Sequence, residues 1–393
     1  MERFVVLDSW RGIAACLVAL FHLYYLRVYG NLYEVPLLQN SWQSVDFFFV
    51  LSGFVIAANY QQRLLDGFGV GRFLLLRLGR LYPLHFTMLA VTVAVKLLLI
   101  LVPALSSITQ SAPAPFSTPQ EAPDTILANL LLIHSLHLYD FLTWNAQSWS
   151  ISTEFYTYVL FAACLVGLRK HGWIVLPVAM IGGPILLAVL STQNLATDVE
   201  WGIIRCVYGF AAGVVVWNVY GRWKDKLRPW LSGSVAEWCA IGFMIAFVSL
   251  SGKTLLSLAA PYVFGLAVLV FAFGTGTASA ILRLRLLVFL GTVSYSIYMV
   301  HVFIARRLLD VGRALDKLGN IDFLAQREVN GQQVYFLGTQ PWHGDIFYLV
   351  YLAIVVAVSY FTYHLIEEPG REWVRNRVQA WRRSTTSRSV ETA

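Results

Sequence analysis

The sequence predicts an all-α integral membrane protein, a bundle of about ten transmembrane helices. Of its 393 residues, 58% are hydrophobic and only 13% are charged, with a mean hydropathy of +0.63, whereas a soluble domain carries about a quarter charged residues. Apolar runs follow one another from residue 5 to residue 366 and leave no polar stretch long enough for a soluble domain. The surplus of 29 Lys and Arg over 22 Asp and Glu is expected to orient the protein in a membrane, and nucleic-acid binding is not expected.

Ten apolar runs have about the 20 residues that a helix needs to cross a bilayer. They lie near residues 5–27, 45–60, 82–105, 148–168, 173–191, 200–220, 235–251, 254–276, 286–305 and 345–366. The first run carries Asp8 and Arg11 and has no A-x-A cleavage pattern. We therefore expect it to stay in the mature protein and not to be removed as a signal peptide.

The stretch 124–140 is shorter, and the distribution of positive charge decides whether it crosses. Cytoplasmic loops collect Lys and Arg. With the cations inside spans left out, 19 lie inside and 7 outside if 124–140 does not cross, whereas a crossing gives 11 inside and 15 outside. We therefore expect this stretch to lie at or dip into the outer face, and both termini to be cytoplasmic.

One transmembrane domain is expected over residues 1–370, followed by a basic cytoplasmic tail over 371–393. Positive charge attracts such a tail to anionic lipid. The four cysteines lie inside apolar runs and form no close pairs, so we expect neither a redox pair nor a zinc site.

Ionisable side chains inside a bilayer are costly, which makes them the first candidates for function. Arg11 and His22 are eleven residues apart on the first helix, close to three helical turns, so they share one face with about 16 Å between their Cα atoms. This spacing predicts an anion-binding group near the cytoplasm and a proton acceptor in the outer half. The alternatives are an ion pair of Arg11 with Asp8 and a histidine that only hydrogen-bonds a neighbouring helix.

Arg77 and Arg80 are three residues apart at the inner end of the third expected span. Two guanidinium groups on one face suit phosphate oxygens, which each can bind through two hydrogen bonds. The alternative is anchoring at the cytoplasmic boundary, and that is the role we expect for Arg63 and Arg72.

Glu154 lies about two turns into the fourth expected span from its outer end. A carboxylate at that depth must pair, protonate or face water. It could orient His22 as the buried acid of a catalytic triad orients its histidine, and a structural hydrogen bond is the alternative. Structural roles are expected for Asp46, His85, His301 and the Glu367-Glu368-Pro369 turn.

Six segments together resemble the membrane-bound acyltransferase 3 family of bacterial O-acyltransferases. They are LDSWRGIAACLVALFH at 7–22, VDFFFVLSGFVI at 45–56, RLGRLYPLH at 77–85, WSISTEFYTYVLF at 149–161, GTVSYSIYMVH at 291–301 and HLIEEPGREW at 364–373. By this resemblance the family's functional residues fall on Arg11, His22, Arg77, Arg80 and Glu154. Thr153-Glu154-Phe155 departs from many members, which carry two adjacent acids there. The chain looks like the stand-alone form, without an appended esterase-like domain.

The resemblance implies transfer of an acyl group, most often acetyl from acetyl-CoA, to a hydroxyl of a surface polysaccharide, a lipid-linked glycan or a glycosylated small molecule. It implies a multi-pass protein of the bacterial inner membrane, with acyl-CoA as co-substrate and no permanently bound cofactor or metal. Arg11, Arg77 and Arg80 would bind the acyl-CoA, and His22 with Glu154 would act on the acceptor hydroxyl.

The catalytic step has two expected forms, and both need one tunnel that joins the arginines to the imidazole. His22 removes the hydroxyl proton as the oxygen attacks the thioester, or it carries the acyl group itself. The alternative from another class is a transporter or flippase that moves a glycan, lipid or acyl group without bond chemistry, using the same buried charges. A scaffolding role is a third possibility. Acceptor specificity is expected in the outer loops 28–44, 106–147 and 306–344.

Overall fold

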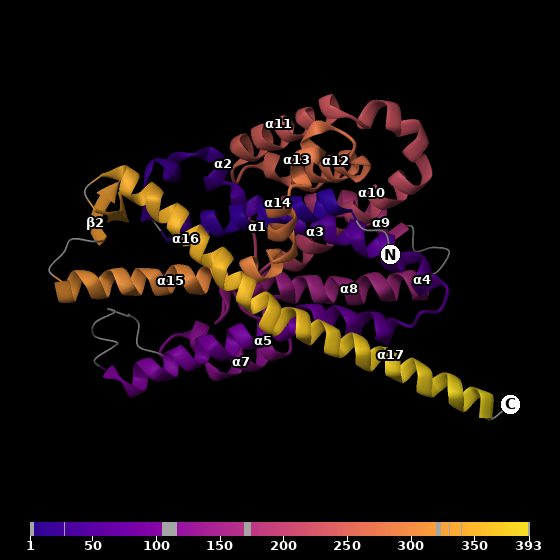
Figure 1. Ribbon diagram of the computed structural model, residues 1–393, viewed down its shortest axis with the longest axis horizontal. Helices are drawn as coiled ribbons and strands as arrows, with labels where there is room; N and C mark the ends of the chain where they lie inside the picture. Colours follow the sequence, from indigo (N-terminus) through magenta and orange to yellow (C-terminus); the bar gives the residue numbers. More distant parts are fainter. Residues whose placement is uncertain are drawn as a thin grey trace.

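Helices make up most of the chain in the computed structural model, which describes residues 4–26, 28–103, 116–168, 174–319, 324–329, 331–338 and 340–391 (Figure 1). Parts of the expected outer loops, residues 104–115 and 320–323, lie outside the described residues. The α-helices are α1 (Val5–Tyr25), α2 (Pro36–Gln39), α3 (Ser44–Ile56), α4 (Gln62–Leu65), α5 (Val70–Leu101), α7 (Pro123–Leu130), α8 (Trp149–Leu168), α9 (Val175–Leu190), α10 (Gly202–Leu231), α11 (Ser234–Ser251), α12 (Ala260–Phe273), α13 (Thr277–Leu282), α14 (Arg285–Thr292), α15 (Ser294–Gly319), α16 (Pro341–Thr362) and α17 (Glu368–Glu391). Two π-helical segments are η3 (Ala57–Gln61) and η8 (Tyr363–Glu367), and the strands are β1 (Val28–Tyr29), β2 (Leu324–Val329) and β3 (Gln332–Leu337).

Helix length and hydropathy confirm the predicted polytopic membrane bundle. Within the described ranges, eight helical stretches are long and apolar enough to cross a membrane. They are Val5–Tyr24, Ser41–Leu65, Val70–Leu101, Ala146–Leu168, Gly202–Leu231, Ser234–Ser251, Leu255–Phe273 and Pro341–Ala380. A ninth consists of α14 and α15, which meet at a bend of 70°. The remaining expected span corresponds to α9, whose 16 residues reach about 24 Å, less than the roughly 30 Å of a hydrocarbon core.

Residues 124–140 contain one short helix, α7. Its eight residues extend about 12 Å, so it cannot span a bilayer of roughly 30 Å. Beyond it, Leu132 and His137 have positive φ angles of 57° and 63°, a conformation in which a right-handed helix cannot continue. The structure agrees with the prediction that this stretch does not cross as a helix.

The third span begins earlier than the sequence predicted. α5 starts at Val70 instead of near residue 82, because arginines in its first turns lower the local hydropathy without disfavouring a helix. Gly67 and Gly69, with φ of 85° and 91°, end the preceding segment. As a result Arg77 and Arg80 lie inside a helix that also contains Pro83.

The expected polar loop 306–344 is also more ordered than predicted. α15 continues to Gly319, and the strands β2 and β3 pair antiparallel, while β1 joins β3 in parallel to give the order β1-β3-β2. The sheet lies at one end of the bundle (Figure 1). Charged residues lower the hydropathy of this part of α15, so the apolar run in the sequence ends before the helix does. Three of them form ion pairs, because Asp310 lies 2.7 Å from Arg307 and 3.3 Å from Arg313.

The centre of the bundle is the contact between α3 and α10, where small residues allow the backbones to approach closely. A Cβ atom on Gly53 would overlap the Phe210 carbonyl, and one on Gly213 would overlap the Val50 carbonyl. Helices in membranes associate through such close packing of small residues. α3 therefore cannot slide along α10. Its other side lines the site described below.

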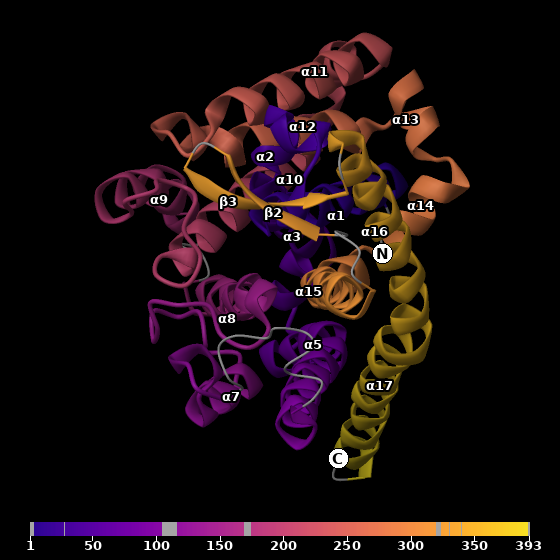
Figure 2. The same cartoon turned by 90° about the vertical axis from the view of Figure 1, so that its left-hand side faces the viewer.

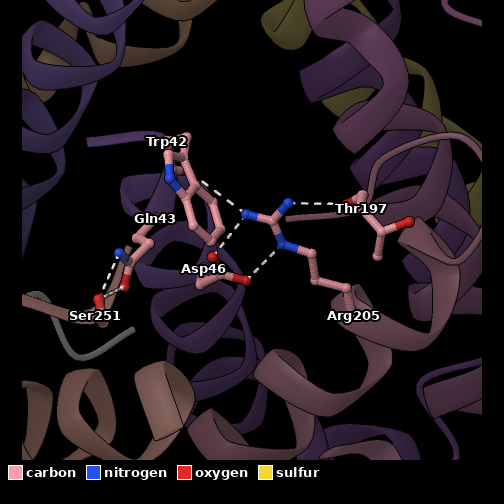
Figure 3. A network of polar contacts seen from close by, with 6 residues as sticks. All are labelled: Trp42, Gln43, Asp46, Thr197, Arg205 and Ser251. Atoms are coloured by element: carbon pink, nitrogen blue, oxygen red, sulfur yellow. Dashed lines mark hydrogen bonds and ion pairs between the residues drawn. The ribbon is translucent and has the colours of Figure 1, made fainter. Parts of the chain in front are cut away.

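A buried ion pair fixes one end of this contact (Figure 3). Arg205 of α10 donates from Nε and Nη2 to the two carboxylate oxygens of Asp46 over 2.8 and 2.7 Å, and from Nη1 to the Thr197 carbonyl over 2.9 Å. The guanidinium also lies over the rings of Trp42 and Trp149. Both charges are fully partnered, which agrees with the structural role expected for Asp46.

The last two helices form one long rod along a side of the bundle (Figures 1 and 2). α16 passes through η8 into α17 without a break at residue 370, where the sequence predicted that the transmembrane domain gives way to a tail. The first turns of α17 pack on α5. Gly79 faces Val374 and Gly370 faces Pro83, and a Cβ atom on either glycine would approach its neighbour to 2.6 Å.

Candidate active site

A cavity of about 860 Å³ lies between α1, α3, α5, α8, α15 and α17. Its charge is set by arginine, because seven arginines and two carboxylates line it. The arginines are Arg11, Arg63, Arg72, Arg77, Arg80, Arg371 and Arg375, and the carboxylates are Asp66 and Glu154. The structure thus brings together four of the five predicted site residues and adds four arginines that the sequence had not placed in a site.

The exposure of its lining residues shows which end of the cavity opens to the surface. The lining residues Asp66, Gly67, Arg375 and Gln379 are exposed, so the mouth lies between the 63–72 segment and α17. The deep end is formed by buried hydroxyl groups of Ser150, Tyr158, Ser294 and Tyr298. Two of these hydroxyls are hydrogen-bonded to charged side chains, Ser294 to Arg11 and Tyr158 to Glu154, so the deep end offers hydroxyl groups together with one positive and one negative charge.

Arg11 joins the cavity to the bend between α14 and α15. Its Nε–H donates to the Ser294 hydroxyl over 2.8 Å, and its Nη2–H donates to the Gly291 carbonyl over 2.9 Å, which satisfies a carbonyl at the end of α14. Asp8 lies 3.8 Å from the same Nη2. The ion pair with Asp8, which was the alternative to a binding role for Arg11, is therefore present. Arg11 also lines the cavity, as a binding role requires.

Arg77 and Arg80 face the cavity from α5. Arg77 donates to the Tyr60 hydroxyl over 3.2 Å and lies over the Tyr60 ring. Its Nε–H is buried and has no hydrogen-bond partner in the part of the chain that the structure describes. A buried donor without an acceptor is rare in native proteins, and a phosphate oxygen is the acceptor that best suits neighbouring guanidinium groups.

Glu367 supports these arginines from behind the cavity wall. It lies in η8, only 1% exposed, and accepts a hydrogen bond from the Ser296 hydroxyl over 2.9 Å. Its carboxylate interacts electrostatically with Arg80 and Arg11. Its negative charge offsets part of the repulsion between these arginines, which would destabilise an uncompensated cluster of like charges.

Glu154 does not contact His22, which corrects the prediction that it orients the imidazole. Its Oε1 accepts hydrogen bonds from the hydroxyls of Ser52 and Tyr158, over 2.6 and 2.5 Å. The reason is packing: α8 lies against α10 and α5, whereas α1 lies against α14, α15 and α3. Glu154 therefore belongs to the arginine cavity, and another residue occupies the place beside the imidazole.

That residue is His301 of α15. Its Nε2 lies 3.1 Å from Nδ1 of His22, and the two rings are 4.5 Å apart between centroids. His301 is fully buried, and its own Nδ1 lies 2.6 Å from the Tyr298 carbonyl. The sequence predicts only a structural role for His301, because nothing in one sequence shows that its helix packs on the first helix.

The backbone carbonyls around the two rings assign their protons. Nδ1 of His22 lies 2.9 Å from the Val18 carbonyl, and a carbonyl can only accept, so this nitrogen carries the hydrogen. Nδ1 of His301 carries a hydrogen for the same reason, which leaves its Nε2 as an acceptor that shares the proton of His22. Nε2 of His22 is then the nitrogen with the free lone pair, as a general base requires.

Tyr298 lies between the cavity and the histidine pair. Its ring lines the deep end of the cavity, and its hydroxyl is held by Ser150 over 2.7 Å and by the Gln147 carbonyl over 2.9 Å. The ring is 5.7 Å from that of His301 on the following turn, and His22 is not among the lining residues. The expected open tunnel from the arginines to His22 is therefore not found in the part of the chain that the structure describes, and the rings of Tyr298 and Phe48, 5.8 Å apart between centroids, both belong to the cavity lining.

A spacing signal for this group was present in the sequence. Ser294, Tyr298 and His301 follow one another at intervals of four and three residues, so they share a helical face, and the same face reaches both the cavity and His22. The described residues include no group of three His, Cys, Asp or Glu side chains that could hold a metal ion.

Comparisons with known proteins match nearly the whole chain to one family. A family model described as an acyltransferase domain matches residues 4–364, nearly the whole chain. One curated relative, "Protein 2 in picA locus" of Rhizobium radiobacter, is 40% identical over 94 residues, which are 24% of this chain and 46% of the relative. The match therefore spans less than half of that relative. No solved structure matches the chain.

Proposed function

This chain belongs to the acyltransferase 3 family, and from that premise we propose that it transfers an acyl group, most readily acetyl, from acyl-CoA to a hydroxyl of a carbohydrate-containing acceptor. The observation that carries the proposal is the arginine cavity, whose deep end lies one helical turn from the His22–His301 pair. A polyanionic donor and a neutral imidazole base suit these two neighbouring environments.

The donor end of the proposal depends on charge. The phosphates of acyl-CoA bind to Arg77 and Arg80, and the buried Nε–H of Arg77 supplies a donor that needs an acceptor. Arg11 and Glu154 lie deeper and contact the hydroxyl groups around the narrow part of the ligand. Glu154 acts here as a positioning residue for the Ser52 and Tyr158 hydroxyls.

The chemical step uses His22. Its Nε2 takes the proton of the acceptor hydroxyl as the oxygen attacks the thioester carbonyl, so that an ester forms and the carbon–sulfur bond breaks. The proton then passes from His22 to the departing thiolate, which leaves as the free thiol of CoA. His301 acts as a positioning residue, because its lone pair on Nε2 accepts from the Nδ1–H that becomes more acidic when His22 is protonated.

Transfer requires the thioester to pass Tyr298, since His22 lies outside the cavity that the arginines line. Movement of the Tyr298 ring or of the neighbouring Phe48 ring opens a passage from the cavity to His22, so that both substrates reach the same base. Such side-chain gating is common where an enzyme keeps water from a reactive donor.

The proposed orientation places the cavity mouth towards the cytoplasm, where acyl-CoA is made, and His22 towards the outer half of a bacterial inner membrane. The basic segments 63–72 and 371–379 at the mouth support it, because cytoplasmic loops collect arginine. The acceptor is then an exported glycan or a lipid-linked one.

The test is acyl transfer by purified protein in nanodiscs, with labelled acetyl-CoA and glycan extracted from cells that lack the protein. The proposal expects labelled ester on the glycan, removed by mild base, and release of one thiol per ester. Labelled glycan that stays absent while glycan or lipid crosses a sealed vesicle membrane would support the transporter instead. His22→Ala separates the two further, because transport without bond chemistry does not need the base.

A further inference from the structure

A second hollow, a groove of about 800 Å³, lies between α8, α9 and α10. It shares no lining residue with the arginine cavity. Aromatic rings separate the two, because Tyr158 of the cavity lining packs on Phe210 of the groove lining with 5.9 Å between ring centroids. The groove is therefore a separate site, and the proposed function does not use it.

Most of the groove is apolar. α10 forms its floor, because Val207, Ala211 and Val214 follow one another at intervals of four and three residues and share one helical face. Leu160 of α8 and Leu176 of α9 belong to the two walls. Leu160 is 43% exposed, and α9 lies at the edge of the bundle (Figure 2), so the groove opens on the outer surface of the bundle.

One end of the groove is polar and positively charged. Asn218 and Arg222 continue the same face of α10, and Gln61 of η3 donates a hydrogen bond to the Asn218 side chain over 3.2 Å. Arg222 is the one charged side chain among the described lining residues. Trp223, the next residue, also lines this end and is 51% exposed.

The dimensions of the groove match one leaflet of a bilayer. Val207 and Arg222 are fifteen residues apart, about 22 Å along a straight helix, and half of a hydrocarbon core is about 15 Å. α8 and α10 both belong to stretches that are long and apolar enough to cross a membrane, so the open side of the groove faces lipid. Tryptophan and arginine are typical of the depth at which acyl chains meet headgroups, which places Arg222 at headgroup level.

We propose that this groove binds one anionic phospholipid, with an acyl chain between α8 and α9 and the phosphate at Arg222. The guanidinium can donate two parallel hydrogen bonds to phosphate oxygens. No carboxylate belongs to the described lining, so nothing in it repels a headgroup with a net negative charge. A positively charged pocket between membrane helices favours such a headgroup over a zwitterionic one.

The test counts the lipids bound to the full-length protein by native mass spectrometry. Delipidated protein in a neutral detergent is titrated with phosphatidylglycerol or with phosphatidylcholine of the same acyl chains. The wild type is expected to bind the first phosphatidylglycerol about tenfold more tightly than phosphatidylcholine, as expected for a charge-assisted contact. Arg222→Gln should remove most of that preference. Lys224→Gln changes the net charge equally on α10 but lies outside the groove lining, and it should keep the preference.

A further variant tests the part of the groove that would hold the acyl chain. Ala179 of α9 belongs to the lining, and Ala179→Trp places an indole in the groove, so binding of both lipids should weaken. Thermal unfolding without added lipid checks that the variants are folded. Arg222 is exposed, so Arg222→Gln tests the proposal even if Ala179→Trp is unstable.

Three results would overturn the proposal. The first is equal binding of the two lipids by the wild type, and the second is an unchanged preference in Arg222→Gln. The third is a dimer that carries no lipid and that Ala179→Trp dissociates, which would assign the groove to a second copy of the chain.

Discussion

Arg205 and the arginines of the cavity occur in the same membrane bundle, but their surroundings differ. Arg205 makes two short hydrogen bonds to one carboxylate, and both side chains are almost fully buried, at 4% and 0% exposure. Arg77 has a hydroxyl and an aromatic ring as partners and a buried Nε–H with none among the described residues. Among the described residues, the ion pairs of Arg371 and Arg375 are long or exposed, and Arg371 also hydrogen-bonds Tyr363.

The difference shows how to distinguish a structural arginine from a binding one. An arginine whose donors are all used by the protein stabilises the fold and has nothing left for a ligand. An arginine with unused donors in a cavity is held for a partner that the chain itself does not contain. By this criterion the Arg205 network holds α3 against α10, whereas the buried Nε–H of Arg77, which has no partner among the described residues, is the donor that we propose for an anion.

The largest effect is expected from breaking the structural pair. Asp46→Ala leaves the Arg205 guanidinium buried without its carboxylate, which should lower the free energy of unfolding by about 3–5 kcal/mol. Thermal unfolding of the purified protein measures this. The matched control is Asp46→Leu with Arg205→Met, which removes both charges and should unfold at a higher temperature than Asp46→Ala. Equal stability of Asp46→Ala and the wild type would contradict the structural role.

A loss of activity without a loss of stability is expected at His22. His22→Ala removes the proposed base, so acyl transfer should fall by about 10²–10⁴, while the unfolding temperature and the binding of CoA stay close to wild type. His364→Ala, a half-exposed histidine in η8, serves as the control and should keep its activity. Unchanged turnover in His22→Ala would exclude this histidine as the base.

Arg77→Gln and Arg80→Gln should weaken binding of the acyl donor and leave binding of the acceptor unchanged. Loss of a charge-assisted hydrogen bond to phosphate should raise KM for acetyl-CoA by about tenfold or more, with little change in KM for the glycan. Arg228→Gln, at an exposed position near the end of α10, is the control for simple anchoring. An equal rise in both KM values would show that these arginines act through the fold.

The smallest effect is expected at His301. Its proposed role is to accept the Nδ1–H of His22, so His301→Ala should lower kcat by about tenfold or more and shift the pH dependence of kcat/KM, with KM for acetyl-CoA unchanged. His301→Gln offers an amide oxygen at a similar place and should recover part of the activity. A loss of activity in both variants together with unfolding would assign His301 to packing alone.

Much of this organisation was predictable from the sequence. Apolar runs and the distribution of Lys and Arg predicted the bundle and the short α7, because the bilayer imposes length and charge rules on each segment separately. The helical phase of Arg77 and Arg80 placed both on one face, and the structure brings them into one cavity with Arg11 and Glu154.

The remaining features depend on which helices are neighbours, and hydropathy does not contain that information. Nothing in one sequence shows that α15 packs on α1, so the partner of His22 was assigned to Glu154 instead of His301. The same holds for Tyr298 between the two halves of the site and for Arg371 at the cavity mouth. The small sheet was missed because its strands are short and depend on pairing between residues 28–29 and 332–337.

We propose that the arginine cavity binds the acyl donor and that the histidine pair carries out the chemical step. The most direct measurement follows labelled acetyl-CoA with three proteins in nanodiscs, wild type, Arg80→Gln and His22→Ala, and records binding without acceptor and ester formation with the glycan. We expect Arg80→Gln to bind the donor weakly, and His22→Ala to bind it as well as the wild type but to form no ester. Loss of donor binding in His22→Ala with normal binding in Arg80→Gln would contradict this proposal.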